Sequence, residues 1–183
     1  MAMKQIELTD GNKIPQLGLG TWKLTGTECT NIVKKALEIG YRHIDTAEMY
    51  GNEEEIGEAI KESEVSRKDL FITSKIWPER GLDYEGVITS SNNSLEKLKT
   101  EYLDLYLLHW PQQHLDYEEI FRALRDLKKE GKIKSIGVSN FTVNHLKDIF
   151  SLTEKLGLEI IVNQVEFHPL LYQKELLDFC NQH

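Results

Sequence analysis

The chain has 183 residues and a formal net charge of −8 at pH 7. This acidic balance argues against a nucleic-acid backbone or an anionic membrane surface as the main partner. The sequence has neither a secretory signal nor a stretch near the ~18 apolar residues of a membrane span, so we expect a cytoplasmic protein. Two cysteines, Cys29 and Cys180, are too few for a disulfide framework, and we expect reduced thiols.

The N-terminal segment 1–15 is predicted to contain a β-hairpin, from Met3 to Pro15. Ile6 and Leu8 alternate with polar residues, and Asp10-Gly11-Asn12 is typical of a tight two-residue turn. The hairpin precedes the first strand–helix unit. It would therefore close one end of a barrel.

Short apolar runs typical of strands recur every 26 to 33 residues along the rest of the chain. These runs occupy residues 17–19, 43–45, 70–75, 103–109, 133–138 and 159–164. Amphipathic helices are predicted between them; in the first, Cys29, Val33 and Leu37 share one face, which ends at Gly40. Strict alternation of apolar strands and helices predicts a parallel sheet covered by helices.

The starts of two helices carry sequence signals of capping. Asn52 with Glu55, and Asp116 with Glu119, resemble capping boxes, so each is predicted to open a helix. A final amphipathic helix is predicted over residues 173–183, and it runs to the last residue without a Gly or Asn stop signal.

Both a (β/α)8 barrel and a doubly wound sheet fit this alternation. The first turn, Gly18-Leu-Gly-Thr-Trp22, lacks the last glycine of a dinucleotide fingerprint. Asp45 ends the second strand, but it begins a dense polar segment and does not have the sequence context of an acidic residue that binds ribose. We therefore favour the barrel. Eight units need about 250 residues, so the barrel is predicted to be truncated. We predict one α/β domain over residues 1–183, an incomplete TIM barrel that consists of the hairpin and about six βα units over residues 16–183.

Titratable residues follow three of the predicted strands: Asp45 and Tyr50, then Lys75, then His109. Taken singly, each is more often a structural group. A lysine that ends an apolar strand requires an anion, and we expect Asp45 to supply it. The nearby ammonium would lower the Tyr50 pKa from its usual ~10. Tyr50 would then protonate a carbonyl oxygen that His109 orients.

Four segments, in chain order, resemble motifs of the aldo-keto reductases. Residues 40–54, GYRHIDTAEMYGNEE, are similar to the first signature of that family, and residues 103–111 to its fourth-strand motif. Residues 136–141 and 162–169 resemble the fifth and sixth strands. The resemblance implies a (β/α)8 reductase that transfers hydride from NADPH, with NADH as the alternative, to an aldehyde or ketone. It also places the catalytic tetrad on the same four residues.

The resemblance implies a cofactor site and a substrate site as well. The implied cofactor contacts are Thr21, Trp22, Asp45, Ser139, Asn140 and Gln164. The implied substrate contacts are Trp22, Tyr50, Trp77, His109 and Trp110. The family's seventh-strand aromatic and its loop for the adenosine 2′-phosphate have no counterpart in residues 1–183. His43, His145 and His168 lack metal-like spacing, so we expect structural roles and no metal site.

Two other functions stay open at this point. One is a non-catalytic barrel that senses a cofactor or binds a partner, and the other is a half-barrel fragment that associates with itself. The complete set of titratable residues favours an enzyme over the first. We expect a monomer for the full-length protein. A truncated form would expose unpaired strand edges, through which it could associate with itself. Without the family's seventh-strand aromatic and 2′-phosphate loop, the 183-residue chain is expected to be inactive.

Overall fold

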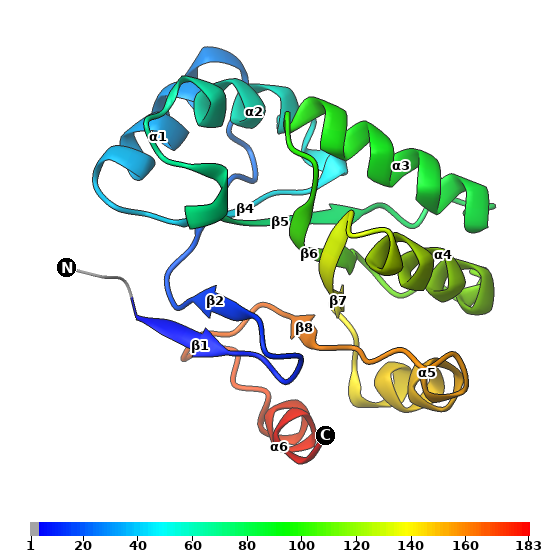
Figure 1. Ribbon diagram of the computed structural model, residues 1–183. Helices are drawn as coiled ribbons and strands as arrows, with labels where there is room; N and C mark the ends of the chain where they lie inside the picture. The colour runs from blue at the N-terminus through cyan, green and yellow to red at the C-terminus, as the bar shows by residue number, and fades with distance from the viewer. Residues whose placement is uncertain (1–3) are drawn as a thin grey trace.

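The computed structural model describes residues 4–183, and Figure 1 shows their arrangement. A curled sheet of six parallel strands has the order β3-β4-β5-β6-β7-β8. Its strands are β3 (Leu19–Gly20), β4 (His43–Asp45), β5 (Phe71–Ile76), β6 (Leu103–Leu108), β7 (Ile133–Ser139) and β8 (Val162–Gln164). Because neighbours in the sheet are also neighbours in sequence, the structure confirms the half-barrel and rules out a doubly wound order.

The helices between the strands pack along the outer side of this sheet (Figure 1). They are α1 (Gly26–Glu38), α2 (Glu53–Glu62), α3 (Tyr84–Lys97), α4 (Tyr117–Lys129) and α5 (Val143–Lys155), with 3₁₀ turns at Glu48–Tyr50 and Arg67–Asp69. A last helix, α6 (Lys174–Gln182), follows β8. Within the described residues, no helix combines the length and apolar character needed to cross a membrane.

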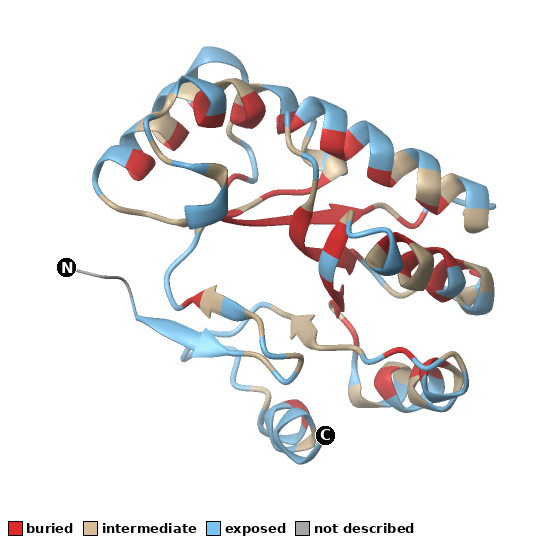
Figure 2. Cartoon of the chain, viewed as in Figure 1, coloured by how far each residue is buried: buried red, intermediate tan, exposed pale blue. Residues whose placement is uncertain are grey.

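The central strands of the sheet are buried on both faces. The side chains of β5 and β6 are all buried, whereas those of β1 (Gln5–Glu7) and most of α6 are exposed (Figure 2). The larger apolar cluster lies between the sheet and its helices. A smaller cluster of Phe71, Leu105 and Leu107 faces the barrel interior. Each Å² of apolar surface removed from water stabilises the folded state by roughly 25 cal/mol. The larger cluster therefore contributes most of the hydrophobic stabilisation of this fold.

The N-terminal hairpin packs against the smaller cluster. Its strands are β1 and β2 (Lys13–Pro15), and Ile14 contacts the interior cluster. The predicted two-residue turn is instead a three-residue loop of Thr9, Asp10 and Gly11: the Leu8 N–H donates to the Asn12 carbonyl at 2.8 Å, and the Gly11 N–H donates to the Leu8 carbonyl at 2.9 Å. This loop docks on β7: the Ser135 hydroxyl donates to Asp10 Oδ2 at 2.8 Å and accepts from Asn12 Nδ2 at 3.0 Å. Met3 lies outside the described residues.

Asn52 and Asp116 both precede the first residue of a helix, as predicted, but only one of them makes the predicted side-chain cap. The Asp116 carboxylate accepts hydrogen bonds from the first turn of α4, as predicted. The Asn52 side chain makes no such bond to α2. It donates instead to the carbonyl oxygens of Thr21 and Leu24 and accepts from the Thr46 hydroxyl at 2.9 Å. Asn52 therefore ties the loop after β3 to the loop after β4, next to the candidate site.

Candidate active site

The four predicted catalytic residues meet at the carboxyl ends of three adjacent strands. Asp45 is the last residue of β4, Lys75 lies near the end of β5, and His109 directly follows β6. Tyr50 ends the 3₁₀ turn that follows β4. In the parallel register Asp45 aligns with Thr73, and Lys75 with Leu107. Adjacent parallel strands therefore deliver these side chains to one rim, as in a βα barrel.

Lys75 and Asp45 form a buried ion pair, which confirms the partner predicted for this lysine. Lys75 Nζ lies 2.5 Å from Asp45 Oδ1 and donates a second hydrogen bond to the Thr46 carbonyl at 2.9 Å. Only 1% of the lysine side chain is exposed. Burial lowers the Lys75 pKa, and the Asp45 carboxylate opposes that shift. The carboxylate thus compensates part of the cost of burying the ammonium.

The Tyr50 ring lies over this ion pair, with its centroid 5.2 Å from Lys75 Nζ. Burial, and after it the negative charge of Asp45, raises the Tyr50 pKa above its ordinary value of 10.0. The predicted net lowering of this pKa is therefore wrong. Burial of the phenol and the Asp45 carboxylate together outweigh the attraction between the Lys75 ammonium and a phenolate. Tyr50 consequently stays protonated at neutral pH.

His109 is held between two aromatic rings. Its centroid lies 5.6 Å from that of Tyr50 and 5.4 Å from that of Trp77, both edge-on. Burial, followed by the positive charge of Lys75, lowers the pKa of His109 from 6.5 to about 4. Its Nδ1 atom is buried and has no hydrogen-bond partner among residues 4–183. His109 therefore presents a neutral imidazole, which can donate one hydrogen bond.

We expect the His109 imidazole to titrate near pH 4 in an NMR titration of the folded protein. Because the unfolded state takes up this proton at a higher pH, the free energy of unfolding falls as the pH drops from 6.5 to about 4. At about 1.4 kcal/mol per pKa unit, the loss is on the order of 3 kcal/mol. A His109 midpoint near 6.5 would contradict the buried, neutral imidazole.

The residues implied to bind the cofactor join the same network. Gln164 Nε2 donates to Asp45 Oδ2 at 2.6 Å, and the Ser139 hydroxyl donates to the Gln164 carbonyl at 2.9 Å. Asn140 Nδ2 donates to the His109 carbonyl at 3.0 Å. Asn140 has a φ of 65°, a left-handed conformation that asparagine tolerates better than most residues. The ends of β7 and β8 are thus tied to the tetrad.

The polar atoms of this set fit a primary carboxamide, such as that of nicotinamide. Within residues 4–183, Asn140 Oδ1 and Gln164 Oε1 accept no hydrogen bond, whereas both amide nitrogens donate. A carboxamide has two N–H donors and one acceptor oxygen. It could therefore donate to both oxygens.

The three tryptophans lie differently. Trp77 is partly buried and contacts His109, whereas Trp22 and Trp110 are 63% and 44% exposed. Lys23 Nζ lies 4.5 Å from the Trp22 ring centroid. Thr21 is fully buried, and its hydroxyl donates to the Asp45 carbonyl at 3.1 Å. Thr21 therefore supports the backbone of Asp45.

Two residues near the tetrad were not identified from the sequence. Thr46 holds Lys75 through a main-chain carbonyl, and Glu48 accepts a hydrogen bond from the main-chain N–H of Trp77. Bonds to the backbone leave no residue-type signal in a sequence. The imidazoles predicted to be structural make hydrogen bonds within the fold: His43 with Thr73 on the neighbouring strand, His145 with the Thr142 N–H, and His168 with Glu166.

Comparison with known proteins identifies this arrangement. The model of the aldo/keto reductase family matches residues 16–183. The chain is 50% identical to glyoxal reductase of Bacillus subtilis over 176 residues, which are 96% of the chain and 62% of that protein. It is 46% identical to the methylglyoxal reductase DkgA of Escherichia coli over 172 residues, 93% of the chain and 60% of that protein. The chain thus spans about three fifths of these relatives.

Solved structures agree with the sequence comparison. An aldo/keto reductase from Brucella melitensis superposes with a TM-score of 0.91 at 44% identity, over 100% of this chain and 70% of that one. A Bombyx mori aldo-keto reductase, solved in complex with NADP, gives a TM-score of 0.87 at 34% identity, over 100% of this chain and 64% of that one.

Proposed function

This chain belongs to the aldo/keto reductase family, and on that premise we propose that the whole protein reduces small aldehydes to alcohols, with NADPH as the reductant. Two relatives named as glyoxal and methylglyoxal reductases support this substrate class. The observation that carries the proposal is the buried Lys75–Asp45 pair beneath Tyr50, with a neutral His109 beside it. A non-catalytic barrel would not require this set.

In the proposed reaction Tyr50 is the proton donor. Its raised pKa keeps the proton on the phenol until negative charge develops on the substrate oxygen. An alkoxide is a much stronger base than a phenolate, so the transfer is downhill once that charge forms. The adjacent ammonium of Lys75 stabilises the phenolate that remains. Asp45 keeps Lys75 in place, and a neutral His109 donates a hydrogen bond to the substrate oxygen.

The cofactor would lie at the ends of β7 and β8. Ser139, Asn140 and Gln164 would hold its carboxamide, with Thr21, Trp22 and Asp45 on the other side of the site. A bound reduced nicotinamide supplies the hydride in this chemistry. The hydrogen bond from Gln164 to Asp45 supports the assignment, because it connects cofactor binding directly to the ion pair beneath Tyr50.

Aromatic side chains would form the substrate site. Trp77 contacts His109, and the exposed rings of Trp22 and Trp110 supply apolar surface at the rim. Tyr50 and His109 would then be the polar groups that bind the carbonyl oxygen. We further propose a monomeric, cytoplasmic protein.

The test is an assay of NADPH oxidation by the whole protein with methylglyoxal, glyoxal and larger aldehydes. We expect oxidation that depends on the aldehyde and that yields the corresponding alcohol. NADH in place of NADPH is the cofactor control, and faster turnover with NADH would overturn the NADPH assignment. No aldehyde-dependent oxidation with either cofactor would contradict the proposed function.

A further inference from the structure

The 3₁₀ turn that carries Tyr50 begins with Glu48, a residue without a role in the proposed reaction. The turn is closed by a hydrogen bond from the Tyr50 N–H to the Ala47 carbonyl, 3.0 Å long. Glu48 Oε1 accepts a hydrogen bond from the Trp77 main-chain N–H. Trp77 directly follows β5, the strand that carries Lys75. One carboxylate therefore connects the segments of Tyr50 and Lys75.

The environment of Glu48 is unusual for a glutamate on a turn. Burial raises its pKa; hydrogen bonds from the Trp77 N–H and the Ser90 hydroxyl oppose the shift, and the charges of Glu53 and Glu79 add to it. Burying a carboxylate costs free energy unless hydrogen bonds compensate. The donor that compensates this cost is the Trp77 N–H at the end of β5. Glu48 is thus a specific link between the turn that carries Tyr50 and the end of β5.

The geometry around His109 shows why this link matters. The Tyr50 and Trp77 rings both pack edge-on against the same imidazole, at 5.6 and 5.4 Å. A shift of either segment would change the position of the phenol relative to His109. Displacements of about 1 Å at a reacting group can reduce a rate about a hundredfold.

We propose that Glu48 is a positioning residue: by binding the Trp77 main-chain N–H, it fixes the turn that carries Tyr50 relative to His109 and the end of β5. This role rests on the proposed function. The contact itself does not, and it can be tested separately.

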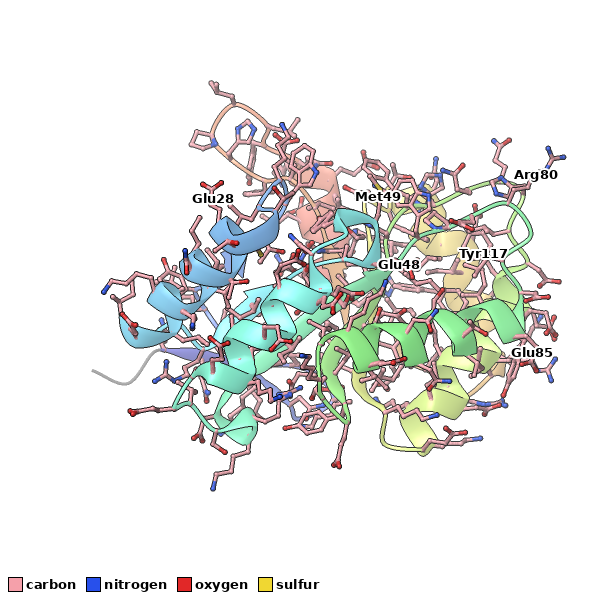
Figure 3. The ribbon with its side chains drawn as sticks, turned by 90° about the horizontal axis from the view of Figure 1, so that it is seen from above. Glu28, Glu48, Met49, Arg80, Glu85 and Tyr117 are labelled. Carbon is pink, nitrogen blue, oxygen red and sulfur yellow. The ribbon has the colours of Figure 1, made fainter. Side chains whose placement is uncertain are left out.

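Three variants separate the contact from side-chain volume and charge. Glu48→Leu retains much of the bulk but cannot accept a hydrogen bond. Glu48→Gln removes the charge but retains a carbonyl oxygen that can accept one. Glu85→Leu is the matched control, because Glu85 is exposed in the first turn of α3. Figure 3 shows Glu48 toward the middle of the molecule and Glu85 at the outer end of that helix.

The first measurement is amide hydrogen exchange at Trp77, which does not depend on activity. In Glu48→Leu we expect exchange of this N–H to accelerate at least about tenfold, because it loses its acceptor. Glu48→Gln and Glu85→Leu should exchange as the wild type does. Unchanged exchange in Glu48→Leu would show that the contact does not hold this segment, and would overturn the proposal.

The second measurement is steady-state kinetics of aldehyde reduction by the whole protein. We expect Glu48→Leu to lower kcat by about tenfold to a hundredfold, with the KM for NADPH nearly unchanged. Glu48→Gln should recover most of this loss. Equal kcat values in Glu48→Leu and wild type, or an equal loss in Glu48→Gln, would overturn the positioning role. A wild-type protein without reductase activity would overturn the proposed function as well, whereas the exchange experiment would still report on the contact.

Discussion

Replacing Tyr50 with phenylalanine is expected to lower kcat/KM for small aldehydes by about 10²- to 10⁴-fold, the usual contribution of a general acid. The substitution removes one oxygen atom and keeps the ring that packs against His109. The loss should therefore appear in kcat, and the midpoint of thermal unfolding should stay close to that of the wild type. The measurement is steady-state reduction of methylglyoxal by the whole protein.

Tyr102→Phe is the matched control for this experiment. Tyr102 directly precedes β6, at the opposite end of that strand from His109, and its ring lies 4.0 Å from the Arg67 guanidinium carbon. Removing its hydroxyl should leave kcat/KM unchanged. Equal activity in Tyr50→Phe and wild type would contradict the role of Tyr50 as the proton donor.

Replacing Lys75 with methionine should reduce both activity and stability. Asp45 would lose its cation, and breaking a buried pair from one side typically costs about 3–5 kcal/mol in the free energy of unfolding. We expect the lower part of this range, because Gln164 still donates to the Asp45 carboxylate. Activity should fall by at least about 10²-fold, since the ammonium no longer stabilises the phenolate. Urea unfolding and steady-state kinetics measure the two effects.

The double variant Asp45→Asn/Lys75→Met separates the two effects. Removing the unpaired carboxylate should restore part of the stability lost in Lys75→Met, because no uncompensated charge is left buried. Activity should stay low, since the ammonium is still absent. If the stability losses of Asp45→Asn and Lys75→Met simply add, the two residues do not act as a pair.

The ion pair was predictable from the sequence because the physics leaves few options. A lysine at the end of a buried strand must meet an anion, and Asp45 ends the neighbouring strand in a parallel sheet. The direction of the Tyr50 pKa was not predictable in the same way. It depends on how completely Asp45 neutralises Lys75 and on how far the phenol is buried, and both are set by the folded geometry.

Local sequence rules failed where distant residues compete for the same side chain. Asn52 has the spacing of a helix cap, yet its side chain bonds to Thr21, which is 31 positions away along the chain. The hairpin loop has three residues instead of two, and the side chains of Asp10 and Asn12 next to it both bind Ser135 on β7. The contact of Glu48 with the Trp77 N–H was not predictable, because every residue except proline offers that donor. The order of the strands, in contrast, was predictable, because the alternation with helices left two parallel folds and the missing dinucleotide fingerprint after the first strand favoured the barrel.

Deuterium transfer tests the central claim most directly. The whole protein is supplied with methylglyoxal and with NADPH that carries deuterium at both positions of nicotinamide carbon 4. Our account predicts an alcohol with one deuterium on the former carbonyl carbon in the wild type, and a loss of that product in Tyr50→Phe. An unlabelled alcohol from the wild type, or labelled alcohol formed equally fast by Tyr50→Phe, would contradict a reductase in which Tyr50 donates the proton.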